Sequence, residues 1–158
     1  MPDRHAPRRA PPVRPAWARA RARGISVAAR LAMRALVPIG RVLFALIFVA
    51  SVIGHFSDAQ IAQASAHGVP LATIGVPIAG LIALAGGVSI MLGYRARFGA
   101  LLLLVFLVPV TLVMHKFWGL PDPQMAMMQR INFMKNTSLI GACLMIMYFG
   151  SGPYSLDT

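Results

Sequence analysis

Four long apolar stretches constrain the fold of this chain more than any other feature of the sequence. They cover residues 37–56, 70–93, 98–115 and 132–150. As helices, stretches of about 18 to 24 residues reach across a hydrocarbon core that is about 30 Å thick. Strands of a membrane barrel are about half as long and alternate apolar with polar side chains. The sequence therefore predicts an all-α fold, a four-helix transmembrane bundle embedded in a lipid bilayer.

Composition and motifs exclude several other classes of protein. Hydrophobic residues make up 58% of the chain and charged residues 12%, whereas soluble domains carry about 25% charged residues. The lone cysteine, Cys143, excludes an intrachain disulfide framework, a zinc finger and a CxxC redox pair. None of the four stretches contains a carboxylate, which argues against a proton-coupled exporter. The composition therefore favours a small multi-pass membrane protein.

The N-terminal part of the chain differs from the rest. Residues 1–34 contain nine Arg, five Pro and one acid, Asp3. Such a segment buries too little apolar surface to fold alone, so we expect a basic arm that is largely disordered. Alternatively, residues 17–34 form a basic amphipathic helix on the membrane surface. The membrane domain then covers residues 35–158.

Two further expectations concern this arm. It contains a single aromatic residue, Trp17, so it offers no series of rings on which bases could stack, and we expect no nucleic-acid partner. Met33 stands just before the first apolar stretch. A protein that starts at Met33 therefore remains an alternative.

Basic residues predict the orientation of the bundle. The N-terminal flank together with Arg41, Arg95 and Arg97 gives twelve basic groups on one side, against Lys116, Arg130 and Lys135 on the other. Loops rich in Lys and Arg stay in the cytoplasm. We therefore expect both termini to be cytoplasmic, in a bacterial inner membrane.

Small residues recur every fourth position in the second stretch, at Gly75, Ala79, Ala83 and Gly87. Such a stripe lets helix backbones approach closely. It serves either packing within the bundle or formation of a homo-oligomer, and the sequence does not separate the two.

Polar side chains collect near the predicted outer ends of the helices. His55, His115, Lys135 and Asn136 are the candidates for a binding site, because ionisable groups at the membrane boundary are functional candidates by default. Histidines on one side could ligate a metal or a haem or hydrogen-bond a quinone carbonyl, and a quinone is the cofactor that we expect if the site binds one. No HxxxH spacing occurs, so no metal site is predicted, and interfacial polarity alone is the competing explanation.

Several short motifs, read in order over residues 41–157, resemble the DoxX family of small bacterial membrane proteins. They are Arg41 before the first apolar run, Ala66-His67-Gly68-Val69-Pro70, Gly86-Gly87 with Gly93 and Arg97, His115-Lys116-Phe117-Trp118, Phe133-Met134-Lys135-Asn136, and Gly152-Pro153 with Ser155-Leu156-Asp157. The family commonly has a Glu three residues before the paired glycines, where this chain has Ala83. The resemblance implies four transmembrane helices in the plasma membrane.

The same resemblance implies a link to redox chemistry, because some DoxX relatives are subunits of thiosulfate:quinone oxidoreductases and others resemble organisers of redox-defence assemblies. Two hypotheses follow. The chain is a non-catalytic membrane subunit that recruits a soluble redox partner, or it is a quinone-interacting electron-transfer subunit. The absence of a cysteine pair and of the Glu favours the first hypothesis, in which the chain has no catalytic activity of its own.

Overall fold

The computed structural model describes residues 16–157, with side chains from residue 26 onward. Five α-helices and one 3-10 helix follow in order: α1 (Ala16–Ser51), η1 (Val52–Phe56), α2 (Asp58–Ala66), α3 (Ala72–Leu92), α4 (Ala96–Met114) and α5 (Pro123–Phe149). No strand occurs among the described residues, so the all-α prediction is confirmed. The disorder expected for the first part of the arm concerns residues outside the described range. Two units are distinguished, Met1–Met33 and Arg34–Thr158, and the following paragraphs concern the second.

Three helical segments are long and apolar enough to cross a membrane: Ser26–Phe56, Ala72–Leu92 and Ala96–Met114. The fourth predicted stretch, 132–150, is helical but does not belong to this group. Its first half contains Asn132, Lys135 and Asn136 followed by Thr137 and Ser138, and these polar residues lower its mean hydropathy. Sequence and structure therefore agree on three apolar spans, and the fourth crossing remains a prediction.

The first predicted span, 37–56, does not continue as one regular helix. The α-helix ends at Ser51, and residues Val52–Phe56 tighten into the 3-10 helix η1. The expected loop 57–69 then contains α2, which begins at Asp58. Ser57 caps it, because the Ser57 hydroxyl accepts a hydrogen bond from the backbone N–H of Gln60 at 3.3 Å. This short helix folds against α3 and η1.

α5 also differs from the prediction, since it begins at Pro123 rather than near residue 132. The Asp122 carboxylate accepts a hydrogen bond from the N–H of Gln124 at 2.9 Å and caps the helix. Pro123 follows at the first helical position, where the missing N–H costs little. The expected loop 116–131 is therefore largely helical.

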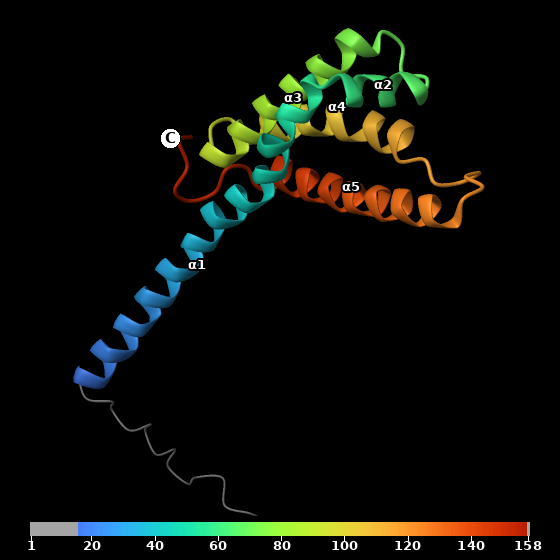
Figure 1. Cartoon of the computed structure of the whole chain (residues 1–158). Coiled ribbons are helices and arrows are strands. Elements are labelled where there is room, and N and C mark those ends of the chain that lie inside the picture. The colour runs from blue at the N-terminus through green and yellow to red at the C-terminus, as the bar shows by residue number, and fades with distance from the viewer. Residues whose placement is uncertain (1–15, 158) are drawn as a thin grey trace, which may run out of the picture. The chain divides into compact units, whose positions relative to one another are not determined.

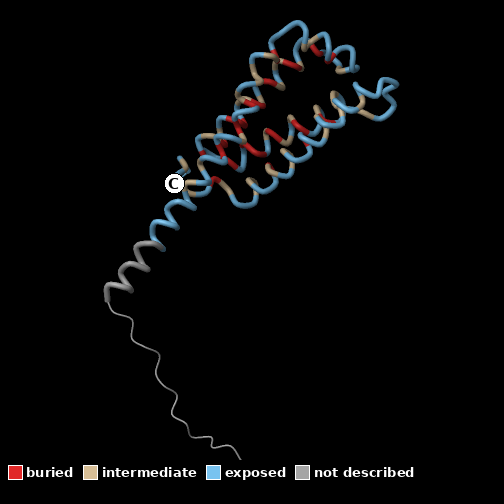
Figure 2. Tube along the Cα trace, turned by 60° about the horizontal axis from the view of Figure 1, so that its bottom comes forward, coloured by how far each residue is buried: buried red, intermediate tan, exposed pale blue. Residues whose placement is uncertain are grey.

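Two adjacent glycines let α3 pack against a different helix on each side. A Cβ on Gly86 would lie 2.8 Å from the carbonyl oxygen of Gly99 on α4, and one on Gly87 would lie 3.2 Å from Cβ of Phe48 on α1. Because successive helical residues point about 100° apart, Gly86 allows close contact with α4 and Gly87 allows close contact with α1. Figure 1 shows α3, α4 and α5 as neighbouring elements, and Figure 2 shows the buried positions on their inner faces.

The stripe of small residues divides between two environments. Ala83 is fully buried in the core and Gly87 contacts α1, as close packing requires. Gly75 and Ala79 instead line a cavity. Within the described residues the stripe therefore has roles inside the chain, and a homo-oligomer remains a prediction.

The last residues of the chain close one end of the bundle. The backbone N–H of Leu156 donates to the Leu92 carbonyl at 3.3 Å, and that of Asp157 donates to the Gly93 carbonyl at 3.0 Å. The N–H of Arg95 in turn donates to Asp157 Oδ1 at 2.7 Å. We call residues 150–157 the C-terminal segment. This end carries Arg41, Arg95 and Arg97, and we call it the basic end.

Candidate functional site

At the opposite end from the C-terminal segment, η1, α2, α3 and α4 line a half-open cavity of about 430 Å³, within the range of small-molecule sites. Its polar side chains are His55, Gln60, Gln63 and His115. The remaining lining residues, such as Val76, Ile82, Phe106, Val113 and Met114, are glycine, proline or apolar residues. The lining contains no Lys, Arg, Asp or Glu. We call this space the histidine cavity.

His55 is held firmly in one orientation. It is 7% exposed, its Nδ1 lies 2.9 Å from the Ser51 carbonyl oxygen, and its ring centroid lies 5.7 Å from that of Phe106. A carbonyl can only accept, so Nδ1 carries the proton that it donates. In the neutral ring Nε2 is then an acceptor.

His55 lies deeper than the sequence indicates. It packs against Gly80 and Phe106, each eight residues from the nearer end of its helix. Eight helical residues correspond to about 12 Å. The reason is that α1 ends at Ser51 and α2 folds over η1, so that the histidine is covered instead of facing the membrane boundary.

His115 borders the cavity where α4 ends. Its Nδ1 donates to Oε1 of Gln129 on α5 at 2.9 Å, which again leaves Nε2 as the acceptor in the neutral ring. Pro109 and Val105 line the cavity on the same helix. Because Pro109 lacks an N–H, the carbonyl of Val105 loses its partner within the helix. The cavity is thus bordered by the two imidazoles and by the carboxamides of Gln60 and Gln63, which add both donors and acceptors.

Of the four candidate site residues, the structure brings His55 and His115 to one cavity and leaves two outside it. Lys135 is exposed, and its Nζ donates to Oδ1 of Asn132 on its own helix at 3.3 Å. Asn136 is 5% exposed and stands one and two turns before Ile140 and Cys143, which belong to the core. Neither residue lines the cavity.

Sequence reasoning missed Gln60 and Gln63, because it treated 57–69 as an irregular loop. The spacing Ser57-x-x-Gln60, typical of a helix start, was the signal for α2. Among the described residues no three His, Cys, Asp or Glu side chains lie close enough to hold a metal ion.

Comparison with known proteins gives the family. The sequence model of the SURF4 family matches residues 29–158. The chain belongs to the SURF4 family. A relative named inner membrane protein YphA, from Escherichia coli (strain K12), is 28% identical over 100 residues, which is 63% of this chain and 71% of the relative. No solved structure matches this SURF4-family chain.

The assignment to the DoxX family was therefore wrong. The motifs behind it are short, and the structure gives most of them general packing roles. Gly93 ends α3 with a φ of 66°, Gly86 and Gly87 separate neighbouring helices, and Ser155 to Asp157 join the C-terminal segment to the bundle. Helix hairpins in a membrane need small residues at such places, so the motifs distinguish families poorly.

Proposed function

We propose that this SURF4-family chain is a non-catalytic membrane protein that binds the head group of a membrane quinol in the histidine cavity. The observation that carries the proposal is the pair of imidazoles, His55 and His115, each with Nδ1 engaged by the protein and Nε2 left as an acceptor. A quinol has two hydroxyl groups that donate hydrogen bonds. It is therefore complementary to two acceptors at one cavity.

The charge of the cavity supports an uncharged ligand. Its polar lining consists of imidazoles and carboxamides, and the rest is apolar. A charged ligand in a membrane protein needs a charged partner, since placing an unpaired charge in hydrocarbon costs about 3 kcal/mol or more. A neutral ring with hydroxyl groups fits this lining. An oxidised quinone can only accept hydrogen bonds, so it would depend on the carboxamide N–H groups of Gln60 and Gln63 as donors. We therefore expect the reduced form to bind more tightly.

The redox-linked role expected from the sequence rests on this ligand. A bound quinol would give a partner protein a redox-active group at the membrane. We therefore propose that the chain recruits a soluble redox partner only on the condition that it binds the quinol. The three apolar helices and the name of the relative YphA support residence in a bacterial inner membrane. The cytoplasmic position of both termini is part of the same proposal.

Thermal unfolding of the full chain in mild detergent tests the proposal. A short-chain quinol should raise the melting temperature saturably, and the matching quinone should raise it less. At a hundred times Kd, one bound ligand adds about 2.7 kcal/mol. His55→Gln and His115→Gln should each weaken binding about tenfold or more. The matched control is His67→Gln, since His67 is exposed and does not line the cavity.

Two results would count against the quinol. One is an unchanged melting temperature of the wild-type chain with both redox forms. The other is equal binding by His55→Gln, His115→Gln and His67→Gln, which would move the ligand out of the histidine cavity.

A further inference from the structure

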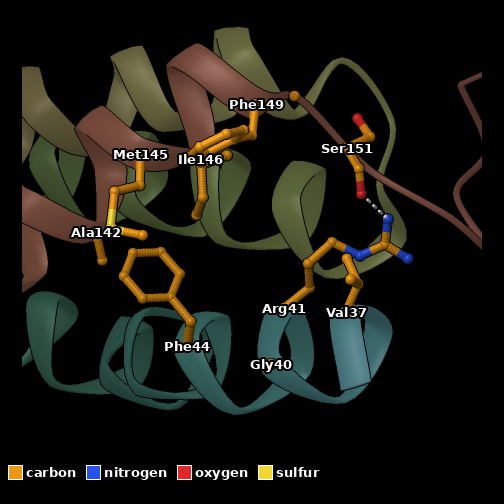
Figure 3. Close-up of a pocket in the computed structure, with 10 residues that line it drawn as sticks. Val37, Gly40, Arg41, Phe44, Ala142, Met145, Ile146, Phe149 and Ser151 are labelled. Carbon is orange, nitrogen blue, oxygen red and sulfur yellow. Dashed lines mark hydrogen bonds between the residues drawn. The ribbon is translucent and has the colours of Figure 1, made fainter. Parts of the chain in front are cut away.

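A second hollow, independent of the histidine cavity, lies between α1 and α5. It has a volume of about 310 Å³. Figure 3 shows Phe44 on α1 facing α5 at one end and Arg41 reaching toward Ser151 at the other. Its walls are otherwise apolar, with Val37 on α1 and Ala142 and Ile146 on α5. We call this hollow the α1–α5 groove.

Arg41 is an unusual residue for such a wall. It is 7% exposed. Its Nη1 donates to the Ser151 carbonyl at 2.5 Å and its Nη2 to the Tyr154 carbonyl. Its Nε is buried without any hydrogen-bond partner, and Asp157 is the acid that attracts the guanidinium electrostatically. A buried cation whose hydrogen bonds all go to neutral carbonyls is costly, so a second anion besides Asp157 at this end of the groove would stabilise it.

The surroundings of Arg41 are also positive. The Arg34 guanidinium lies 5.8 Å from the centre of the Tyr154 ring, and Arg97 Nη2 donates to the Tyr148 carbonyl at 3.3 Å. The one acid in the C-terminal segment, Asp157, accepts hydrogen bonds from the Ser151 hydroxyl and the Arg95 N–H. The charge at this end of the groove is therefore complementary to an anion.

We infer that the α1–α5 groove binds an anionic phospholipid, with an acyl chain along the apolar walls and the phosphate at the basic end. The two halves of the groove match the two halves of such a lipid. A membrane supplies this ligand at high local concentration, and basic side chains near its surface attract anionic lipids. The lipid also accounts for Arg41, because its phosphate supplies an acceptor for the unpartnered Nε and a further negative charge beside Asp157.

Native mass spectrometry of the full chain in mild detergent tests the inference. We expect phosphatidylglycerol to bind at least tenfold more tightly than phosphatidylcholine with the same acyl chains. Gly40→Leu should abolish this preference by filling the groove, because Gly40 lines it and a Cβ there meets nothing within 4 Å. Gly141→Leu is the matched control, since Gly141 has the same open space but does not line the groove.

A second variant, Ala142→Leu, narrows the groove from the side of α5. It tests the same site if Gly40→Leu fails to fold. Equal binding of the two lipids would overturn the role of Arg41, and undiminished selectivity in Gly40→Leu and Ala142→Leu would overturn the groove as the site. The chain could instead form a dimer without bound lipid, which dissociates in Gly40→Leu but not in Gly141→Leu. This result would show that a second copy covers the groove, and it would also overturn the inference.

Discussion

At the scale of single residues, His55 depends on a glycine that is distant in sequence. A Cβ on Gly80 would lie 2.5 Å from Cβ and 2.8 Å from Cγ of His55, both too close for atoms that do not move. The imidazole is also fixed by Ser51 and Phe106, so it has no free direction in which to yield. Gly80 therefore sets the position of the ring in the histidine cavity.

Gly80→Ala should displace His55 and weaken quinol binding, and it should destabilise the chain by about 1–3 kcal/mol because the added methyl overpacks a buried contact. Thermal unfolding in detergent, with and without ligand, measures both effects. Gly141→Ala serves as the control, since its Cβ meets nothing within 4 Å, and it should be neutral or slightly stabilising. If the two variants melt and bind alike, Gly80 does not position His55.

At the scale of elements, hydropathy predicts where helices run but not where they break. The apolar stretches 70–93 and 98–115 correspond to α3 and α4, because an apolar helix in lipid satisfies its own backbone. The break at Ser51 depends on packing of η1 against Gly80 and α3, which no local pattern records, whereas α2 has only the short start signal Ser57-x-x-Gln60. His55 and His115 were found as polar residues in an apolar context. Lys135 and Asn136 were predicted as site residues only from their expected depth in the membrane. Depth does not specify which face of a helix a side chain occupies.

The C-terminal segment is an element whose attachment depends on pH. The hydrogen bond from the Ser151 hydroxyl, and next that from the Arg95 N–H, lower the pKa of Asp157 below its usual value. A carboxylate with a lowered pKa stabilises the folded state above the unfolded pKa of about 3.9 and loses this effect as the pH falls through the folded value. Stability should therefore decrease below about pH 4.

Asp157→Asn should remove this acid-dependent loss and lower the melting temperature at neutral pH. The measurement is thermal unfolding from pH 7 downward. Asp58→Asn, an exposed acid in the first turn of α2, is the control and should retain the dependence of the wild-type chain on acid. A wild-type pH profile in Asp157→Asn would mean that the carboxylate does not hold the segment.

At the scale of the whole membrane unit, geometry argues for a fourth crossing that hydropathy misses. α5 begins beside the end of α4, where His115 bonds Gln129 at 2.9 Å. It ends beside the start of α4, where Arg97 Nη2 donates to the Tyr148 carbonyl at 3.3 Å. Figure 1 shows α4 and α5 side by side. If α4 crosses the membrane, we therefore expect α5 to return across it.

The polar residues of α5 lower the cost of that crossing by internal contacts. The hydroxyls of Thr137 and Ser138 donate to the carbonyls of Phe133 and Met134 at 2.9 and 3.1 Å. Asn136 is buried against protein instead of lipid, and the long side chain of Lys135 can reach the interface. A hydropathy average counts each of these side chains as fully exposed to hydrocarbon, and this explains why it excludes the helix.

Labelling of single cysteines in intact cells decides between three and four crossings. In a Cys143→Ala background, an impermeant maleimide should label Leu120→Cys, in the connection between α4 and α5, without permeabilisation. Ala32→Cys and Leu156→Cys should react only after permeabilisation, because four crossings return the chain to the side of its N-terminal arm. All three positions are exposed or partly exposed, so accessibility within the protein does not bias the result. Labelling of Leu156→Cys together with Leu120→Cys would mean that α5 stays on the outer side, and the bundle would then cross the membrane three times.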